Sequence, residues 1–126
     1  MNTQMNILYV DDHDDTCRAI SRLLKLLGHE VTTANSVTTA LAAANEKKFH
    51  LLISDIGLPD GDGHALLKEM LAVRPIHGIA VSGYGDSEEV EKSLNGGFAE
   101  HLVKPITVDQ LQAAIERVKT KVSFGE

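Results

Sequence analysis

Short apolar runs alternate with amphipathic stretches along the whole chain. Five runs are short and rich in Val, Ile and Leu, as buried strands are, and they span 5–10, 30–34, 50–54, 76–82 and 99–103. The stretches between and after them place apolar residues at helical spacing. This alternation of strand and helix predicts an α/β domain with a parallel sheet.

Five helices are expected, one after each strand. Their boundary signals are Gly28 after the first helix, Ser36 before the second, Pro75 after the third, Asp86 before the fourth, and the capping-box pair Thr107 and Gln110 at the fifth. Asp14 and Asp15 are expected to cap and charge the start of the first helix. The fourth helix, from 86 to about 95, has only Val90 and Leu94 as strong apolar anchors, so we expect it to be the most loosely held.

Parallel strands joined by right-handed crossovers leave few topologies for five βα units. The simplest is a doubly wound, flavodoxin-like (βα)5 sandwich with a five-stranded parallel sheet in the order 2-1-3-4-5. In this order the ligand crevice lies at the carboxyl ends of strands 1 and 3. Functional residues should gather there.

Size and composition narrow the classes of function. A chain of 126 residues fits one domain spanning 1–126, and its ends, roughly 1–4 and 122–126, are expected to be flexible. A net charge of −6 without clustered Lys and Arg argues against direct binding to nucleic acid. Cys17 is the single cysteine, which favours a reducing compartment, and no apolar run is long enough to cross a membrane. We therefore expect a cytoplasmic protein without membrane insertion.

Four predicted strands end in charged or polar residues, which are Asp11 and Asp12, Asp55, Ser82, and Lys104 for strands 1, 3, 4 and 5. Neighbouring strands lie about 4.8 Å apart, so the three carboxylates can reach one ion. Hard oxygen ligands favour Mg²⁺, with Mn²⁺ as the alternative, over zinc. Aspartates after a strand are more often helix caps or hydrated loop residues, but this matched placement favours a metal site.

Asp55 is the candidate nucleophile at this edge of the sheet. A carboxylate can attack a phosphoryl group to form an acyl phosphate, and Mg²⁺ commonly bridges carboxylates to such a group. Lys104 and Ser82 would neutralise and hold the phosphoryl oxygens. A nucleotide site is disfavoured, because acidic residues and not a glycine-rich turn follow the first strand.

Four motifs carry a resemblance to a known family: the pair Asp11-Asp12, SDIGLPDGDG around Asp55, VSG around Ser82, and VKP around Lys104. Together they resemble the receiver domain of two-component response regulators over essentially the full chain. The resemblance implies that Asp55 accepts a phosphoryl group from a phosphohistidine of a sensor histidine kinase or a histidine phosphotransfer protein. It also implies that Asp12 and Asp55 bind Mg²⁺ directly, Asp11 largely through water, and Gly57 through its backbone carbonyl. The Lys104-Pro105 peptide is expected to be cis.

Three further positions, His101, Gly57 and Tyr84, correspond to positions that modulate receivers. Receivers usually carry Tyr or Phe where this chain has His101, and that ring moves inward as the serine shifts toward the phosphoryl group. His101 either acts with Ser82 as such a switch or lies half exposed on an end strand. Gly57 and Tyr84 occupy positions that tune acyl-phosphate lifetime in the family, and Tyr84 either shields the site or is an exposed loop aromatic. The sequence leaves these alternatives open.

The resemblance implies a phosphorylation-dependent signalling switch that catalyses only its own phosphorylation and dephosphorylation. The face formed by helix 4, strand 5 and helix 5 would change, with protein binding or phosphoryl relay as the output. The stretches SGYG and GFAEHLVKP are similar to receivers of hybrid sensor histidine kinases, so a covalently linked kinase in the parent protein is one expected partner. Kinase choice is expected to depend on exposed residues of the first helix, with Thr16, Cys17, Arg18 and Ser21 as the candidates.

Two other classes fit parts of the pattern. A small aspartyl-phosphate phosphatase of the haloacid dehalogenase type also uses an aspartate nucleophile, but Gly57 stands where its second aspartate belongs. The chain also has no spare length for the cap that such an enzyme needs. A receiver-like interaction module that is not phosphorylated would usually lack an acidic residue, the acceptor or the lysine, and all of these are present.

Overall fold

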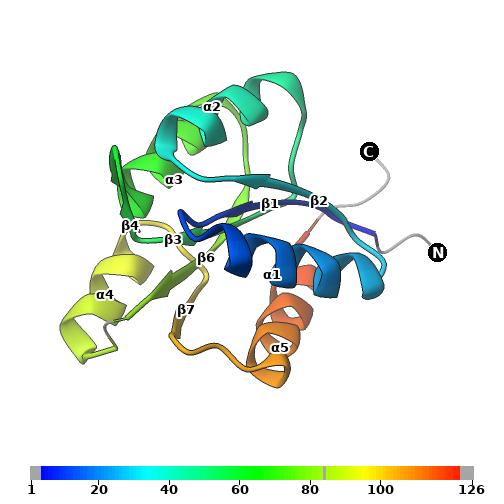
Figure 1. Ribbon diagram of the computed structural model, residues 1–126. Helices are drawn as coiled ribbons and strands as arrows, with labels where there is room; N and C mark the ends of the chain where they lie inside the picture. Colours follow the sequence, from blue (N-terminus) through cyan, green and yellow to red (C-terminus); the bar gives the residue numbers. More distant parts are fainter. Residues whose placement is uncertain (1–3, 84, 123–126) are drawn as a thin grey trace.

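Five parallel strands form the centre of the molecule. A computed structural model describes residues 4–83 and 85–122. The strands are β1 (Asn6–Val10), β2 (Glu30–Ala34), β3 (Leu51–Asp55), β6 (His77–Ser82) and β7 (Glu100–Val103), in the order β2-β1-β3-β6-β7 (Figure 1). The predicted doubly wound topology is confirmed. Most of the ends predicted to be flexible, and Tyr84, lie outside the described residues.

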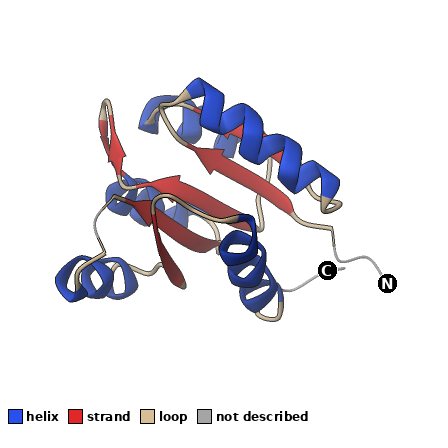
Figure 2. Ribbon diagram, turned by 60° about the horizontal axis from the view of Figure 1, so that its bottom comes forward, coloured by secondary structure: helices blue, strands red, loops and turns tan. Residues whose placement is uncertain are grey.

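Helices cover both faces of this sheet (Figures 1 and 2). They are α1 (Asp14–Leu26), α2 (Val37–Glu46), α3 (Gly63–Val73), α4 (Ser87–Asn95) and α5 (Val108–Lys119). Ile7 and Tyr9 of β1 pack with α1 and α5, whereas Leu8 and Val10 pack with α2 and α3. Side chains of a strand alternate between faces, and both faces of β1 are buried from Ile7 to Val10, which explains why apolar and aromatic residues follow one another there. In the part of the chain that is described, no helix is long and apolar enough to span a membrane.

The helix boundaries follow the predicted signals, with one correction. Ser36, Asp86 and Thr107 accept hydrogen bonds from backbone N–H groups of the first turns of α2, α4 and α5, and Gly28 has a φ of +95° after α1. The capping role predicted for Asp14 and Asp15 is wrong, because His13 holds the N-cap position without a side-chain cap bond. The two aspartates lie in the first turn, where they complement the positive end of the helix.

α4 is held differently from the other helices. Neither hydrophobic cluster found among the described residues contains a residue of α4. Leu94 was predicted as an anchor, but it is 46% exposed, and the buried residue of this helix is Ser93, with 0% exposure. The prediction for Leu94 is therefore wrong, and a polar contact takes the place of an apolar one.

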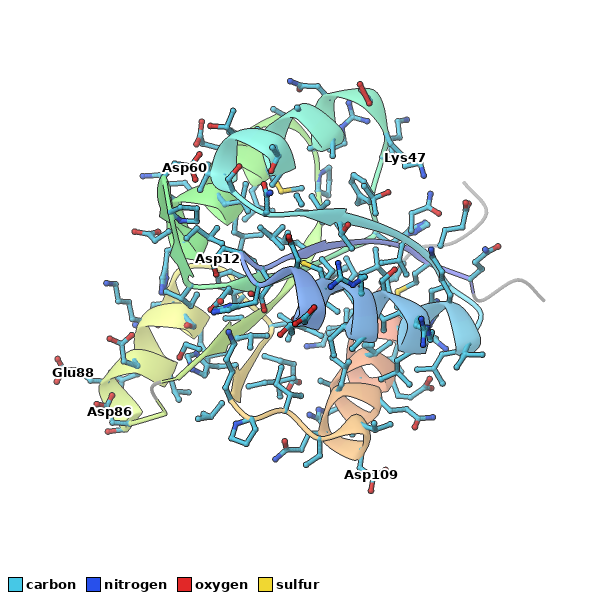
Figure 3. The ribbon with its side chains drawn as sticks, viewed as in Figure 1. Asp12, Lys47, Asp60, Asp86, Glu88 and Asp109 are labelled. Atoms are coloured by element: carbon cyan, nitrogen blue, oxygen red, sulfur yellow. The ribbon has the colours of Figure 1, made fainter. Side chains whose placement is uncertain are left out.

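A small antiparallel hairpin was not predicted. β4 (Gly57–Leu58) pairs with β5 (Gly61–Asp62) directly after β3. Asp60 in its turn accepts hydrogen bonds from the backbone N–H groups of Val37 and Thr38, at 2.7 and 3.0 Å, and so lies against the start of α2 (Figure 3). Asp62 caps α3 by accepting from the N–H of Ala65. The hairpin thus joins the strand that carries Asp55 to two helices.

Candidate functional site

The predicted functional residues lie at the carboxyl edge of the sheet. Asp11 follows β1, Asp55 ends β3, Ser82 ends β6 and Lys104 follows β7. The parallel register sets Asp55 opposite Val81, and the Lys104 N–H donates to the carbonyl of Ser82 at 2.8 Å. The order of the strands therefore brings together residues that are far apart in the sequence.

Lys104 and Asp55 form a hydrogen-bonded ion pair across two strands. Lys104 Nζ donates to Asp55 Oδ2 at 2.8 Å and lies 3.6 Å from Asp11 Oδ2. Asp55 and Asp11 are buried, with 8% and 1% exposure. The peptide between Lys104 and Pro105 is cis, as predicted. One ammonium group thus faces two buried carboxylates.

Burial and charge act against each other at this pair. Burial raises the pKa of Asp55, and the negative charges of Asp11 and Asp12 raise it further. The hydrogen bond and positive charge of Lys104 lower it. The rise is larger, so the pKa of Asp55 lies above its usual value. Burial lowers the pKa of Lys104, but the hydrogen bond and charge of Asp55 outweigh it, so that pKa is raised. One lysine only partly compensates the carboxylates, which leaves the site attractive to a further cation.

The acidic residues can hold a small cation. Asp11, Asp12, His13 and Asp55 each offer a ligand atom, and these atoms lie within 4.8 Å of one another. Opposite ligands of an octahedral Mg²⁺ are about 4.2 Å apart, from bond lengths of about 2.1 Å, so the widest spacing allowed for this cluster is slightly larger than such an ion spans. Asp12 lies at the junction of β1 and α1 (Figure 3). Gly57, two residues after Asp55, opens β4, and its role as a carbonyl ligand stays a prediction.

Two neighbours of Asp11 were missed by the sequence reasoning. His13 Nδ1 lies 3.0 Å from Asp11 Oδ1 and 3.2 Å from Asp12 Oδ1, and the hydrogen bond with Asp11 raises the pKa of this imidazole. The buried Tyr9 hydroxyl donates to Asp11 Oδ2 at 3.2 Å. Burial, with the charge of Asp11, raises the pKa of Tyr9. The period-two alternation of β1 could have indicated that Tyr9 and Asp11 share a side of the strand.

Cys17 was predicted among the exposed residues of the first helix, and this is wrong. Its exposure is 7%, and its Sγ donates to the backbone carbonyl of Asp11 at 3.1 Å. Arg18 is exposed, and Thr16 and Ser21 are half-buried. Only three of the four residues proposed for kinase choice are therefore accessible on this helix.

His101 points toward the site and not away from it. Its Nε2 lies 3.3 Å from Ser82 Oγ, and its Nδ1 lies 2.8 Å from the hydroxyl of Ser93 in α4. Ser82 and Ser93 are both buried, with 5% and 0% exposure. His101 is half-buried on β7, which is an end strand of the sheet, so the structure is compatible with both predicted alternatives for this residue. Ser93 was not singled out from the sequence.

A family model, the response regulator receiver domain, matches residues 7–116. The chain belongs to this family. Receiver domains act in phosphorylation-dependent two-component signalling and interact with sensor kinases, and they typically bind Mg²⁺ in an acidic pocket. Membership of this family accounts for both the fold and the carboxylates at the strand ends.

Curated relatives share the receiver but are longer. The transcriptional regulatory protein ZraR of Escherichia coli K12 is 35% identical over 114 residues, which are 90% of this chain and 26% of that protein. The two-component response regulator ARR10 of Arabidopsis thaliana is 36% identical over 120 residues, or 93% of this chain and 22% of that protein. This receiver thus spans about a quarter of the length of these relatives.

Solved structures give the same fold. A CheY-like receiver domain protein from Methanospirillum hungatei superposes with a TM-score of 0.86 at 31% identity, covering 94% of this chain and 95% of that one. A two-component response regulator from Clostridium difficile gives a TM-score of 0.88 at 24% identity, covering 94% and 98%. The second likeness bears on the fold alone.

Proposed function

We propose that this receiver is a switch in which Asp55 accepts a phosphoryl group from a phosphohistidine of a sensor histidine kinase or a histidine phosphotransfer protein. The observation that carries the proposal is the buried Asp55 carboxylate, paired with Lys104 at 2.8 Å beside two further aspartates. The donor is a separate protein or, as the similarity to hybrid sensor kinases implies, a kinase in the same polypeptide.

The transfer is a simple displacement at phosphorus. An oxygen of Asp55 forms the new O–P bond, the P–N bond to the donor imidazole breaks, and its electron pair stays on that nitrogen. The Lys104 ammonium and the Ser82 hydroxyl stabilise the charge on the transferred oxygens. The domain acts in this way on itself and is not an enzyme with separate substrates.

Asp11, Asp12 and Asp55, with the backbone carbonyl of Gly57, would hold Mg²⁺ or Mn²⁺. The bound ion supplies positive charge for the phosphoryl oxygens. The hydrogen bond and charge of Lys104 oppose the rise in the pKa of Asp55 that burial causes, and so favour the ionised, nucleophilic form of this carboxylate. Gly57 and Tyr84 are proposed to influence how long the acyl phosphate persists.

Phosphorylation is proposed to draw Ser82 toward the phosphoryl group and so to change the face of α4, β7 and α5 through His101. Two features support this proposal. His101 already contacts Ser82 and Ser93, and the face exposes Leu94, Val103 and Val108 to 46%, 40% and 54%. Apolar residues on such a face favour protein binding as the output.

The proposal for Asp55 is tested by incubation with Mg²⁺ and acetyl phosphate, followed by intact mass. We expect one added phosphoryl group, which depends on the metal and is lost in Asp55→Asn. No mass increase with any small donor or phosphohistidine donor would favour the unphosphorylated interaction module instead. Multiple turnover of free phosphate esters would favour the phosphatase.

The role of His101 is tested separately. His101→Ala should change the affinity for a partner protein of the α4-β7-α5 face while Asp55 is still phosphorylated. Partner affinity that equals the wild type in both phosphorylation states would overturn the switch role of His101.

A further inference from the structure

A line of three hydrogen-bonding side chains runs from the phosphorylation site to α4. Ser82 Oγ lies 3.3 Å from His101 Nε2, and His101 Nδ1 lies 2.8 Å from Ser93 Oγ. Ser82 ends β6, His101 lies within β7 and Ser93 lies within α4. No residue of α4 belongs to a hydrophobic cluster of the described chain, and the hydrogen bond between Ser93 and His101 joins this helix to β7.

Ser93 has an unusual position for a hydroxyl. It is fully buried on a helix whose other side chains are mostly exposed. A buried hydroxyl that cannot donate its proton loses free energy, and serine is not needed there for packing alone, since alanine has nearly the same shape. Among the described residues, the partner found for the Ser93 hydroxyl is His101 Nδ1. The hydroxyl is therefore best satisfied when Ser93 donates to that nitrogen.

The single ring proton of a neutral imidazole then fixes which atom donates in both hydrogen bonds of His101. A neutral imidazole carries a single N–H, so a ring that accepts at Nδ1 must donate at Nε2. Ser82 Oγ lies within reach of Nε2 and can accept from it. Ser82, which accepts from the ring, keeps its own hydroxyl proton for another acceptor. In the opposite direction Ser82 would donate to His101, and this proton would not be free for a phosphoryl oxygen.

We propose that Ser93 is a positioning residue, which holds the His101 ring inward with its proton on Nε2 and so leaves the Ser82 proton for a phosphoryl oxygen on Asp55. The last step rests on the proposed function of Asp55, whereas the state of the ring does not. Because the line ends on α4, a displacement of this helix removes the partner of Nδ1 and loosens the ring. Coupling of this kind acts equally in both directions, so phosphorylation and the position of α4 bias each other.

The ring is tested by NMR of protein labelled with ¹⁵N in its histidines, without phosphorylation and at about pH 8, above the usual imidazole pKa of about 6.5. The His101 signals are assigned by their loss in His101→Ala. We expect a protonated Nε2 and an unprotonated Nδ1 whose resonance shows an accepted hydrogen bond. Ser93→Ala should shift Nδ1 to the position of a free ring nitrogen. Ser87→Ala, on the exposed first position of the same helix, should leave it unchanged.

The effect on the site is tested with the same variants and acetyl phosphate. Ser93→Ala should slow phosphorylation by about 2- to 10-fold, the range for one neutral hydrogen bond, without a change in Mg²⁺ affinity. The loss should disappear when His101→Ala is already present, since the two residues act through one another.

Two results would overturn the inference: a proton on Nδ1 in the wild type, or a Nδ1 resonance that Ser93→Ala leaves in place. Equal phosphorylation rates for Ser93→Ala and the wild type would remove the proposed effect on Ser82. Absence of phosphorylation in the wild type would instead contradict the proposed function, and the NMR result would still decide how the ring is held.

Discussion

The surroundings of Asp55 support its proposed role as a nucleophile. It is buried, its charge is only partly compensated by Lys104, and Asp11 lies 3.6 Å from the same ammonium group. A carboxylate kept for stability would normally have its oxygens fully paired. The negative charge that Lys104 does not compensate favours the binding of a cation, which in turn favours the binding of a phosphoryl group.

His29 gives a pH dependence that is independent of the site. It is 5% exposed, and its Nδ1 accepts from the Met5 N–H at 3.1 Å. Burial lowers the pKa of this imidazole from 6.5, with a smaller contribution from Lys119. The unfolded chain then binds more protons between the two pKa values, so stability rises with pH there and is lost as the pH falls below 6.5.

His29→Asn keeps a hydrogen-bond acceptor but does not titrate. Urea unfolding at several pH values between about 7.5 and 5 should show a smaller loss of stability in this variant than in the wild type. The variant His77→Asn, on a half-exposed histidine of β6, serves as the control and should follow the wild type. Parallel curves for His29→Asn and the wild type would contradict the assignment.

The residues at the strand ends could be predicted because a parallel sheet puts all carboxyl ends at one edge. That rule brought Asp11, Asp55 and Lys104 together from the sequence. It gives no side-chain directions, so the contacts of His13 with the two aspartates and the inward turn of His101 could not be predicted. Ser93 was missed for a related reason, since a serine in an amphipathic helix usually lies on its polar face.

At the scale of elements, α3 starts unusually close to the strand that carries Asp55. A Cβ at Gly63, the first residue of α3, would lie 2.6 Å from the backbone oxygen of Asp55 and 3.2 Å from Ser54 Oγ. The Gly63 N–H also donates to the carbonyl of Ile56 at 2.8 Å. A larger residue there must move either the helix or the end of β3.

Gly63→Ala should therefore lower the free energy of unfolding by about 1–3 kcal/mol, as overpacking does, and slow the phosphorylation of Asp55. Gly57→Ala is the matched control, because a Cβ at Gly57 meets nothing within 4 Å. Its stability should change by less than about 0.5 kcal/mol. Urea unfolding checks both variants, and equal losses of stability in the two would contradict the close approach. Acetyl phosphate labelling compares Gly63→Ala with the wild type.

The helices and long strands could be predicted because their periodic patterns and caps are strong signals. β4 and β5 have two residues each, which is too short for any period, and they became visible only through pairing. The cap of α1 was misplaced by one residue because three acidic residues and a histidine at its start are all compatible with a helix N-terminus.

At the scale of the whole molecule, the fold brings together carboxylates that repel one another, and one bound cation can reduce this repulsion. An ion that binds only the folded state stabilises the entire domain. Mg²⁺ should therefore raise the melting temperature in a concentration-dependent way. Asp12→Asn should weaken this effect strongly, because it removes one of the grouped ligand atoms.

Asp109→Asn is the control for this measurement, since Asp109 lies at the start of α5 and away from the site (Figure 3). It should keep the full response to Mg²⁺. A melting temperature that does not respond to Mg²⁺ in the wild type, or responds equally in Asp12→Asn, would contradict a metal site at this edge of the sheet.

The central claim is that Asp55 itself becomes an acyl phosphate. Reduction with borohydride after acetyl phosphate treatment converts a phosphorylated aspartate to homoserine, and peptide mass spectrometry then locates it. We predict homoserine at position 55 in the presence of Mg²⁺ and aspartate there when Mg²⁺ is chelated. Homoserine at position 11 or 12, or no homoserine at all, would contradict the account.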